Sequence, residues 1–231
     1  MTGRGAIVTG GTGALGRAVV LALLREGARV AVPYRGDKAW SDLRAAAGDS
    51  PSLWGKSADV AGSRSARGFV DEAAAWLGRL DGVAAIAGAY AGSGRLETTP
   101  EDEWAAMLGA NLETAHAICR SALPHLLKNG GSVVTVGAQA VEKGGAGAAA
   151  YAVSKAGVHA LTRALALENR DRGVRFNCVV PGTIDTPANR RAMPGSDARH
   201  WTPPEEIARV VVFLLSPTSA PVTGGLIPVH G

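Results

Sequence analysis

The sequence predicts an α/β fold in which one parallel sheet is covered by helices on both faces. Two observations carry this prediction. Short apolar runs alternate with longer segments of helical periodicity along the 231 residues. The apolar runs are continuous, which is typical of strands buried on both sides. Because neither an internal repeat nor a linker interrupts the alternation, we expect one doubly wound domain over residues 1–231.

The expected elements follow one another from an early strand to a late one. Residues 6–9 form a first apolar run, residues 14–25 have helical periodicity that Gly27 ends, and residues 29–32 form a second strand. Acidic residues at 101–103 suit the amino-terminal end of a helix over residues 100–128. The remaining strands are expected at residues 82–87, 132–136, 175–180 and 226–229, with helices at 148–172, ended by Gly173, and at 204–215.

Composition narrows the class of protein. The chain is 46% hydrophobic and 19% charged, so it can bury a sizeable core and is not of disordered composition. No window approaches a membrane-spanning length, no signal peptide is evident, and Cys119 and Cys178 lack metal-ligand spacing. We therefore expect a cytoplasmic protein with reduced cysteines and no membrane or metal partner. The net charge of +4 comes from scattered arginines, and only 5% of residues are aromatic, which argues against a nucleic-acid partner.

A glycine-rich segment, residues 9–16, joins the first expected strand to the first helix. Glycines there allow a tight turn and a close approach of the backbone to a pyrophosphate, while the helix amino terminus offers free N–H groups. Standing alone, the segment could be an ordinary strand-to-helix turn. Its place after the first strand of an α/β chain favours a dinucleotide site. The residues expected to contact the cofactor are Gly10, Thr12, Gly13, Leu15 and Gly16.

The end of the second strand bears on which dinucleotide binds. An acid there would bind the ribose 2′-hydroxyl of NAD(H), whereas a basic residue suits the 2′-phosphate of NADP(H). Arg35 comes directly after the strand, and no acid stands at the strand end. We therefore expect NADP(H) as the preferred cofactor. If Arg35 simply lies in solvent and Asp37 binds the ribose, the cofactor is NAD(H).

Tyr151 and Lys155 are the strongest catalytic candidates. They lie four positions apart in a segment expected to be helical, so both side chains project from one face. A positive charge beside a phenol favours the phenolate and lowers its pKa, and such a tyrosine can exchange a proton with a reacting oxygen. Taken alone, the spacing fits a surface tyrosine and a solvated lysine better. The glycine-rich segment far upstream argues for the catalytic interpretation.

With these motifs in this order, the chain resembles the short-chain dehydrogenase/reductase family over essentially its whole length. Asp59-Val60 is similar to the family's adenine-contacting pair, and Ala87-Gly88 is similar to the end of its Asn-Asn-Ala-Gly motif. Asn111 is similar to the helix asparagine of the family. The residues Pro181-Gly182, Ile184 and Thr186 are similar to the family's Pro-Gly loop, which lies beside the nicotinamide.

The resemblance implies a Rossmann-type fold and hydride transfer with a nicotinamide cofactor. It implies that Tyr151 is the general acid/base and that Lys155 lowers the tyrosine pKa and holds the nicotinamide ribose. It also implies that Asn111 anchors a proton-relay water. Relatives usually form tetramers through their long helices and last strand. A homo-oligomer, dimer or tetramer, acting on a small-molecule substrate is therefore expected.

The chain departs from the family where a catalytic serine is expected. That serine stands 13 positions before the tyrosine, and this chain has Ala138 there. Loss of an oxyanion donor typically costs a factor of about 10²–10³ in rate. Gln139 is adjacent, but neighbouring strand residues point to opposite faces, so it need not reach the site. Both asparagines of the family motif are also missing at Ala85-Ile86, and Ala14 replaces the usual middle glycine of the loop.

Several of these departures resemble dihydropteridine reductase, a branch of the same family that also lacks the serine. The similar segments are residues 11–16, 87–92, 185–190, 193–194 and 201–203. The quinonoid ring that this branch reduces is already activated, so it tolerates the loss of one donor. That branch usually carries an acid after the second strand and prefers NADH, and Arg35 departs from this pattern.

The substrate side of the site is expected along residues 183–201. Arg190 and Arg191 in this segment either lie in solvent or favour an anionic substrate. The candidate substrate contacts are Ala138, Gln139, Tyr90, Met193 and Trp201.

Three hypotheses about function follow. The first is an NADP(H)-dependent oxidoreductase acting on a carbonyl or hydroxyl group, or on an activated C=N or quinonoid group. The second is a dihydropteridine-reductase-like enzyme. The third, motivated by Ala138, is a non-catalytic NADP(H)-binding sensor or scaffold. Retention of Tyr151, Lys155 and Asn111 argues against the third, because a sensor has no need of a tuned phenol.

Overall fold

The structure, a computed structural model, describes residues 1–230. Over these residues, seven strands form one sheet in the order β3-β2-β1-β4-β5-β6-β7. Every neighbouring pair is parallel. The strands are β1 (Gly5–Thr9), β2 (Arg29–Tyr34), β3 (Leu53–Ser57), β4 (Gly82–Ala85), β5 (Gly131–Val136), β6 (Val174–Pro181) and β7 (Leu226–Val229).

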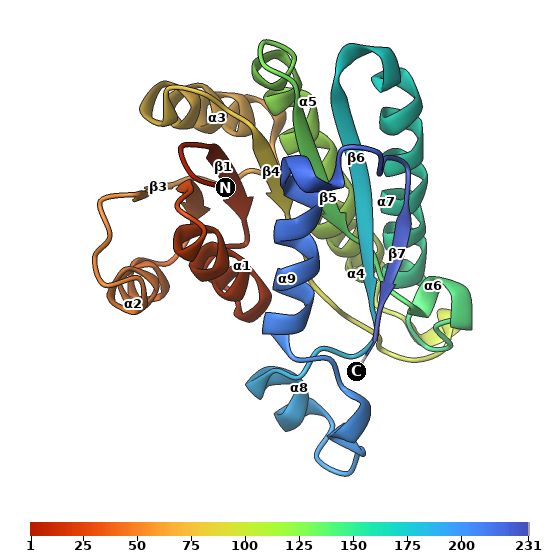
Figure 1. Ribbon diagram of the computed structural model, residues 1–231. Helices are drawn as coiled ribbons and strands as arrows, with labels where there is room; N and C mark the ends of the chain where they lie inside the picture. The colour runs from red at the N-terminus through yellow and green to blue at the C-terminus, as the bar shows by residue number, and fades with distance from the viewer. Residues whose placement is uncertain (231) are drawn as a thin grey trace.

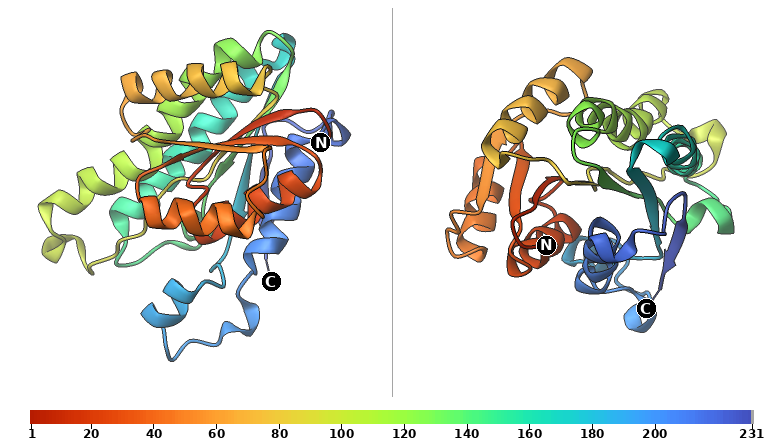
Figure 2. Two further views of the ribbon diagram at one scale, coloured as in Figure 1. Left: turned by 90° about the vertical axis from the view of Figure 1, so that its left-hand side faces the viewer. Right: turned by 45° about the horizontal axis from the view of Figure 1, so that its top comes forward.

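Helices cover both faces of this sheet, as Figures 1 and 2 show. Helices α3, α5 and α7 lie on one face, and α1 and α9 pack together on the other. The helices are α1 (Ala14–Arg25), α2 (Asp37–Ala46), α3 (Ser63–Leu77), α4 (Glu101–Met107), α5 (Thr114–Leu126), α6 (Ala140–Lys143), α7 (Ala149–Glu168), α8 (Pro187–Ala192) and α9 (Pro204–Leu215).

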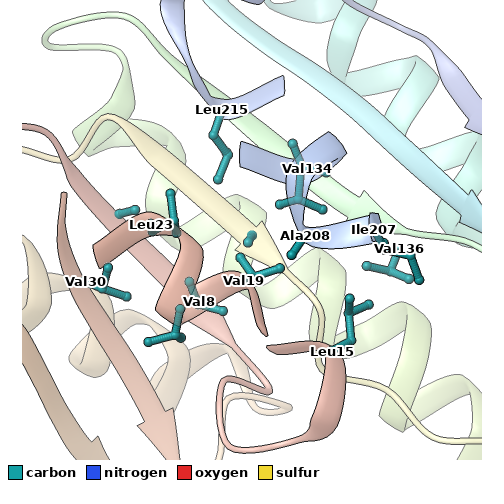
Figure 3. Close-up of a cluster of buried hydrophobic side chains, with 14 of the residues drawn as sticks. Val8, Leu15, Val19, Leu23, Val30, Val134, Val136, Ile207, Ala208 and Leu215 are labelled. Atoms are coloured by element: carbon teal, nitrogen blue, oxygen red, sulfur yellow. The ribbon is translucent and has the colours of Figure 1, made fainter. Parts of the chain in front are cut away.

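Successive strand residues fill two separate hydrophobic clusters. Ala6 and Val8 of β1 pack with α1 and α9, whereas Ile7 between them packs with α3 and α5. Val134 and Val133 of β5 divide in the same way. Figure 3 shows the cluster on the α1 and α9 side. Because strand side chains alternate between faces, a run in which every residue is apolar supplies both clusters at once.

The predicted α/β fold class is confirmed, and the predictions were least complete in the first third of the chain. The bounds of α1, α9 and β7 coincide with the predicted residues 14–25, 204–215 and 226–229. Helix α2, strand β3 and helix α3 were not predicted. The helical stretch predicted over residues 100–128 is found as α4, a π-helical turn, Leu108–Glu113, and α5, which follow one another without a break.

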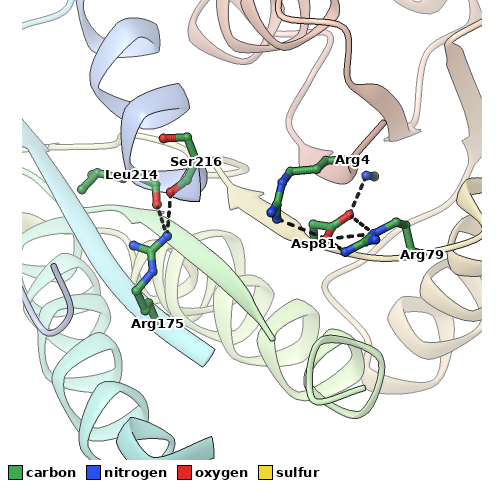
Figure 4. Close-up of polar contacts among 7 residues, drawn as sticks. Arg4, Arg79, Asp81, Arg175, Leu214 and Ser216 are labelled. Atoms are coloured by element: carbon green, nitrogen blue, oxygen red, sulfur yellow. Dashed lines mark hydrogen bonds and ion pairs between the residues drawn. The ribbon is translucent and has the colours of Figure 1, made fainter. Parts of the chain in front are cut away.

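Buried polar contacts stabilise the end of the sheet at which the strands begin (Figure 4). The Asp81 carboxylate is buried and accepts hydrogen bonds from the Gly5 amide at 2.9 Å, from Arg4 at 3.3 Å and from Arg79. Arg175 donates to the Leu214 and Ser216 carbonyls at the end of α9, both at 3.0 Å. These contacts stabilise the end of the sheet that lies opposite the carboxyl ends of the strands.

Candidate active site

A cleft of about 940 Å³ lies outside the carboxyl ends of the strands. The order in which successive strands are added to the sheet reverses between β1 and β4. The loops after these two strands both line the cleft. Ligands of doubly wound sheets bind at such a reversal. Eleven of the predicted cofactor contacts line it: Gly10, Thr12, Gly13, Leu15, Gly16, Arg35, Asp59, Val60, Ala87, Gly88 and Thr186.

The glycine segment forms a tight turn against the first helix. Gly10 has a φ of +66°, a backbone angle that residues with a side chain rarely adopt. A Cβ on Gly16 would lie 2.0 Å from the Gly10 carbonyl oxygen. The Thr9 hydroxyl accepts hydrogen bonds from the Ile86 and Ala87 amides at 3.0 and 3.1 Å, which ties this turn to the loop after β4. The two cleft walls are therefore fixed relative to each other.

The amino terminus of α1 is open to an anion. Its N-cap residue is Gly13, so no side chain caps the helix, and no acidic residue lies in the first turn. The unsatisfied N–H groups and the positive end of the helix dipole therefore point into the cleft. This arrangement fits the diphosphate of a dinucleotide, which approaches such helix ends closely.

Arg35 lies at the end of β2, is exposed and lines the cleft beside Tyr34. The Tyr34 ring stacks on Trp40 with centroids 5.0 Å apart, which fixes the backbone next to Arg35. Asp37 starts α2 and does not line the cleft. The Asp59 carboxylate accepts a hydrogen bond from the Ala61 amide at 3.1 Å. A basic group therefore stands where the second strand ends.

Tyr151 and Lys155 lie on α7, behind the cleft-lining Gly88. A Cβ on Gly88 would lie 3.4 Å from Lys155 Nζ and 2.5 Å from Asn111 Oδ1. Lys155 is buried, and Nζ donates to the Val136 carbonyl at 2.9 Å. Burial lowers the pKa of Lys155 to about 8. The lysine, the asparagine and the end of the cleft therefore meet at Gly88.

The expected lowering of the Tyr151 pKa is not found in this structure. Burial, followed by the charge of Tyr90, raises the pKa of Tyr151 to about 12. The Lys155 ammonium is directed at the Val136 carbonyl, and the loss of solvent around the phenol is the largest cause of the raised pKa of Tyr151. The phenol is therefore protonated at neutral pH when nothing is bound.

Asn111 lies in the π-helical turn between α4 and α5 and is buried. Its side chain exchanges two hydrogen bonds with the Ala89 backbone, both at 3.0 Å, and donates to Ser154 Oγ at 3.0 Å. Asn111 therefore links the loop after β4 to the helix that carries the Tyr–Lys pair. Single π-helical turns often occur at functional positions.

Ala138 is buried and lies in the short connection between β5, which ends at Val136, and α6, which begins at Ala140. Gln139 lies beyond the end of β5, so the alternation of side chains along a strand does not set its direction. Its backbone amide donates to the Pro181 carbonyl at 3.0 Å. Its side chain lies 3.4 Å from the His230 ring nitrogens and faces Gly182. Gln139 thus lies beside the Pro181-Gly182 segment, away from the cleft lining.

The remaining candidate contacts divide into exposed and buried side chains. Tyr90 is 70% exposed, and its ring lies T-shaped against Tyr151 with centroids 4.9 Å apart. Met193 is partly exposed just after α8. Trp201, the remaining candidate substrate contact, is buried and does not line the cleft. Ile184 pairs with Thr202, and neither Pro181, Gly182 nor Ile184 lines the cleft.

Several residues that line the cleft were not predicted from the sequence to contact the cofactor. Tyr34 and Gly36 flank Arg35 and could have been inferred from it, whereas nothing in the sequence separates Arg191 from Arg190. The additional lining residues are Ala14, Pro33, Tyr34, Gly36, Ala58, Ala61, Ile86, Ala89, Ala110, Thr114, Pro187, Ala188 and Arg191.

A short-chain dehydrogenase family model, described as Enoyl-(Acyl carrier protein) reductase, matches residues 11–231. The chain belongs to the short-chain dehydrogenase/reductase family. An uncharacterized NAD-dependent oxidoreductase of Mycobacterium tuberculosis is 31% identical to it, covering 98% of this chain and 94% of the relative. A 3-oxoacyl-(acyl-carrier-protein) reductase of Thermotoga maritima is 30% identical, covering 100% of this chain and 98% of the relative.

A solved structure is similar in both fold and sequence. It is the apo short-chain oxidoreductase of Pseudomonas aeruginosa PAO1, described as containing an atypical catalytic center. It has a TM-score of 0.89 and 27% identity, covering 98% of this chain and 95% of that one. This short-chain dehydrogenase/reductase is therefore an NAD(P)-dependent oxidoreductase of small molecules.

Within residues 1–230, no helix combines the length and the apolar character needed to cross a membrane. The same residues hold no group of three His, Cys, Asp or Glu side chains arranged around a metal ion.

Proposed function

We propose that this short-chain dehydrogenase/reductase uses NADP(H) to reduce a carbonyl, activated C=N or quinonoid group, with Tyr151 as general acid/base. The approach of Lys155 and Asn111 to Gly88 carries this proposal, because it brings the Tyr–Lys helix to the end of the dinucleotide cleft. When bound there, the nicotinamide supplies the hydride.

The chain's own residues would handle the proton. Burial keeps the Tyr151 phenol protonated, with a pKa of about 12, so it can donate a proton to the substrate oxygen or nitrogen on which negative charge develops during hydride transfer. The Lys155 ammonium would stabilise the phenolate that remains. Asn111 holds the Ala89 backbone and, through Ser154, the α7 turn that carries the pair. A phenol that is protonated before the reaction suits reduction of the substrate, because reduction requires a proton donor.

Arg35 supports NADP(H) over NAD(H), although one similar relative is described as NAD-dependent. Isothermal titration with NADPH and NADH tests this. Arg35→Met should weaken NADPH binding by about tenfold and leave NADH unchanged, because only NADPH carries the 2′-phosphate. Lys38→Met is the matched control, since Lys38 pairs with Asp42 and does not line the cleft. Equal losses for both cofactors would refute the assignment.

The buried Ala138 favours a substrate that needs little carbonyl polarisation. Tyr90, exposed beside Tyr151, offers an aromatic surface to a planar ring. Together they support an activated planar acceptor, such as a quinonoid ring, as the second candidate substrate class. NADPH oxidation with ketones, imines and quinonoid pterins distinguishes these classes. Tight NADPH binding without turnover on any of them would support a non-catalytic sensor or scaffold.

We also propose a cytoplasmic homo-oligomer, dimer or tetramer. The two cysteines are free and buried, as suits a reducing compartment. Val153 and Leu167 of α7 and Trp104 of α4 are large apolar side chains with 47, 73 and 45% exposure, and such residues favour an interface between helices. Light scattering that gives a monomer mass at micromolar concentration would refute the oligomer.

A further inference from the structure

Two neighbouring arginines of α8 have different surroundings. Arg190 makes a two-point ion pair with Asp185, with Nε 2.5 Å and Nη2 2.7 Å from the two carboxylate oxygens. Within residues 1–230, the Arg191 side chain makes neither an ion pair nor a hydrogen bond, and it lines the dinucleotide cleft. Adjacent arginines of one short helix therefore face different partners.

The position of Arg191 follows from how α8 is anchored. Pro187, Ala188 and Arg191 all line the cleft, and their spacing places them on one helix face. The Thr186 hydroxyl caps the helix by accepting from the Asn189 amide at 3.1 Å, and Asn189 Nδ2 donates to the Ile184 carbonyl at 2.8 Å. Helix α8, which carries Arg191, is thus held beyond the end of the sheet where the strands end (Figure 1).

Without Arg191, the positive charges in the cleft would not balance the negative charges of the two cofactor phosphates. The charged residues that line it are Arg35, Asp59 and Arg191. Arg35 stands at the end of β2, beside the expected adenosine ribose, and Asp59 is acidic. The α1 amino terminus offers only about half an elementary charge. Each phosphate of a dinucleotide carries a negative charge. Arg191 is the remaining cation among the residues that line the cleft, and it lines the same cleft as the glycine segment.

We propose that Arg191 binds the diphosphate of the dinucleotide cofactor, so that α8 and the glycine segment hold it from two sides. A guanidinium can donate two parallel hydrogen bonds to phosphate oxygens, which fixes both charge and orientation. This assignment rests on the proposed function, in that a dinucleotide occupies the cleft. It differs from the proposed role of Arg35, because the diphosphate is common to NADP(H) and NAD(H).

The test compares Arg191→Met with Arg190→Met, which remove the same charge from adjacent positions of α8. Dissociation constants for NADP⁺ and NAD⁺ are measured by isothermal titration at low and high salt. Arg191→Met should weaken both cofactors by about tenfold and by the same factor, with a smaller dependence of affinity on salt. Arg190→Met should change either affinity by less than about twofold. Thermal unfolding checks that both variants fold.

The possible results separate the two assignments. Equal effects of the two variants would overturn the role of Arg191, and so would a loss confined to NADP⁺, which would place Arg191 at the 2′-phosphate. Unchanged cofactor affinities with a raised KM for anionic substrates would overturn it as well. A wild-type protein that binds neither dinucleotide would refute the proposed function itself, and this inference with it.

Discussion

The aromatic ring of Tyr90 lies T-shaped against the ring of Tyr151, with centroids 4.9 Å apart and planes at 74°. Tyr90 is 70% exposed, so one residue both packs on the candidate catalytic phenol and faces solvent. This contact also contributes to the raised pKa of Tyr151. A substrate that reaches the phenol would therefore contact Tyr90.

Replacing Tyr90 should alter substrate selection more than turnover. Tyr90→Leu should raise KM for aromatic or quinonoid substrates by roughly threefold to tenfold, because an aromatic pair contributes about 0.5–1.5 kcal/mol beyond area burial. Small aliphatic ketones should be unaffected. Tyr90→Phe keeps the ring and should retain the wild-type KM. Steady-state kinetics measure this, and equal effects of Leu and Phe would show that the ring is not used.

Restoring a hydroxyl at Ala138 should raise ketone reduction. Ala138→Ser should increase kcat/KM for ketones by about tenfold or more, because a hydroxyl there would donate to the developing oxyanion. Activated quinonoid substrates should gain little. Ala140→Ser, just beyond on α6, is the matched control. No gain on ketones would mean that the missing donor does not limit the chemistry.

Lys155 makes stability depend on pH in a defined window. Burial lowers its folded-state pKa from 10.5 to about 8, so between these values the unfolded chain holds a proton that the folded chain lacks. The destabilisation is complete below pH 8 and disappears as pH rises to 10.5. Relative to Lys155→Met, the wild type should gain roughly 3 kcal/mol of unfolding free energy across this window. Urea unfolding at several pH values measures the difference, and a constant difference would contradict the burial account.

Asp81 should be a major contributor to stability away from the site. Asp81→Ala should lower the free energy of unfolding by about 3 kcal/mol, because it leaves the Gly5 amide and two arginines without their buried partner. Asp197 also pairs with an arginine, Arg199, but on the surface. Asp197→Ala should therefore cost less than about 1 kcal/mol. Similar losses for the two variants in urea unfolding would argue against a special role for burial.

Much of the fold and of the cofactor wall followed from local sequence patterns. Continuous apolar runs gave the parallel sheet, and the glycine segment gave the turn that faces the cleft. Strand β3 was missed because its sequence, Leu-Trp-Gly-Lys-Ser, is only partly buried at the sheet edge and has no apolar run. The π-helical turn was missed because one inserted residue leaves helical periodicity almost unchanged.

The less predictable features depend on contacts between distant segments. Arg190 and Arg191 are identical in type, and only the helix register and Asp185 distinguish them. The Tyr151 pKa depends on how closely α7 and the Tyr90 loop exclude water, which side-chain spacing along one helix does not determine.

The most direct test of the central claim is the rate of NADPH oxidation by Tyr151→Phe. It is measured with whichever ketone, imine or quinonoid pterin the wild type reduces best. The variant should bind NADPH as the wild type does and lose at least about 10²-fold in kcat, because the phenylalanine ring keeps the packing and lacks the proton. An unchanged kcat would show that Tyr151 is not the general acid.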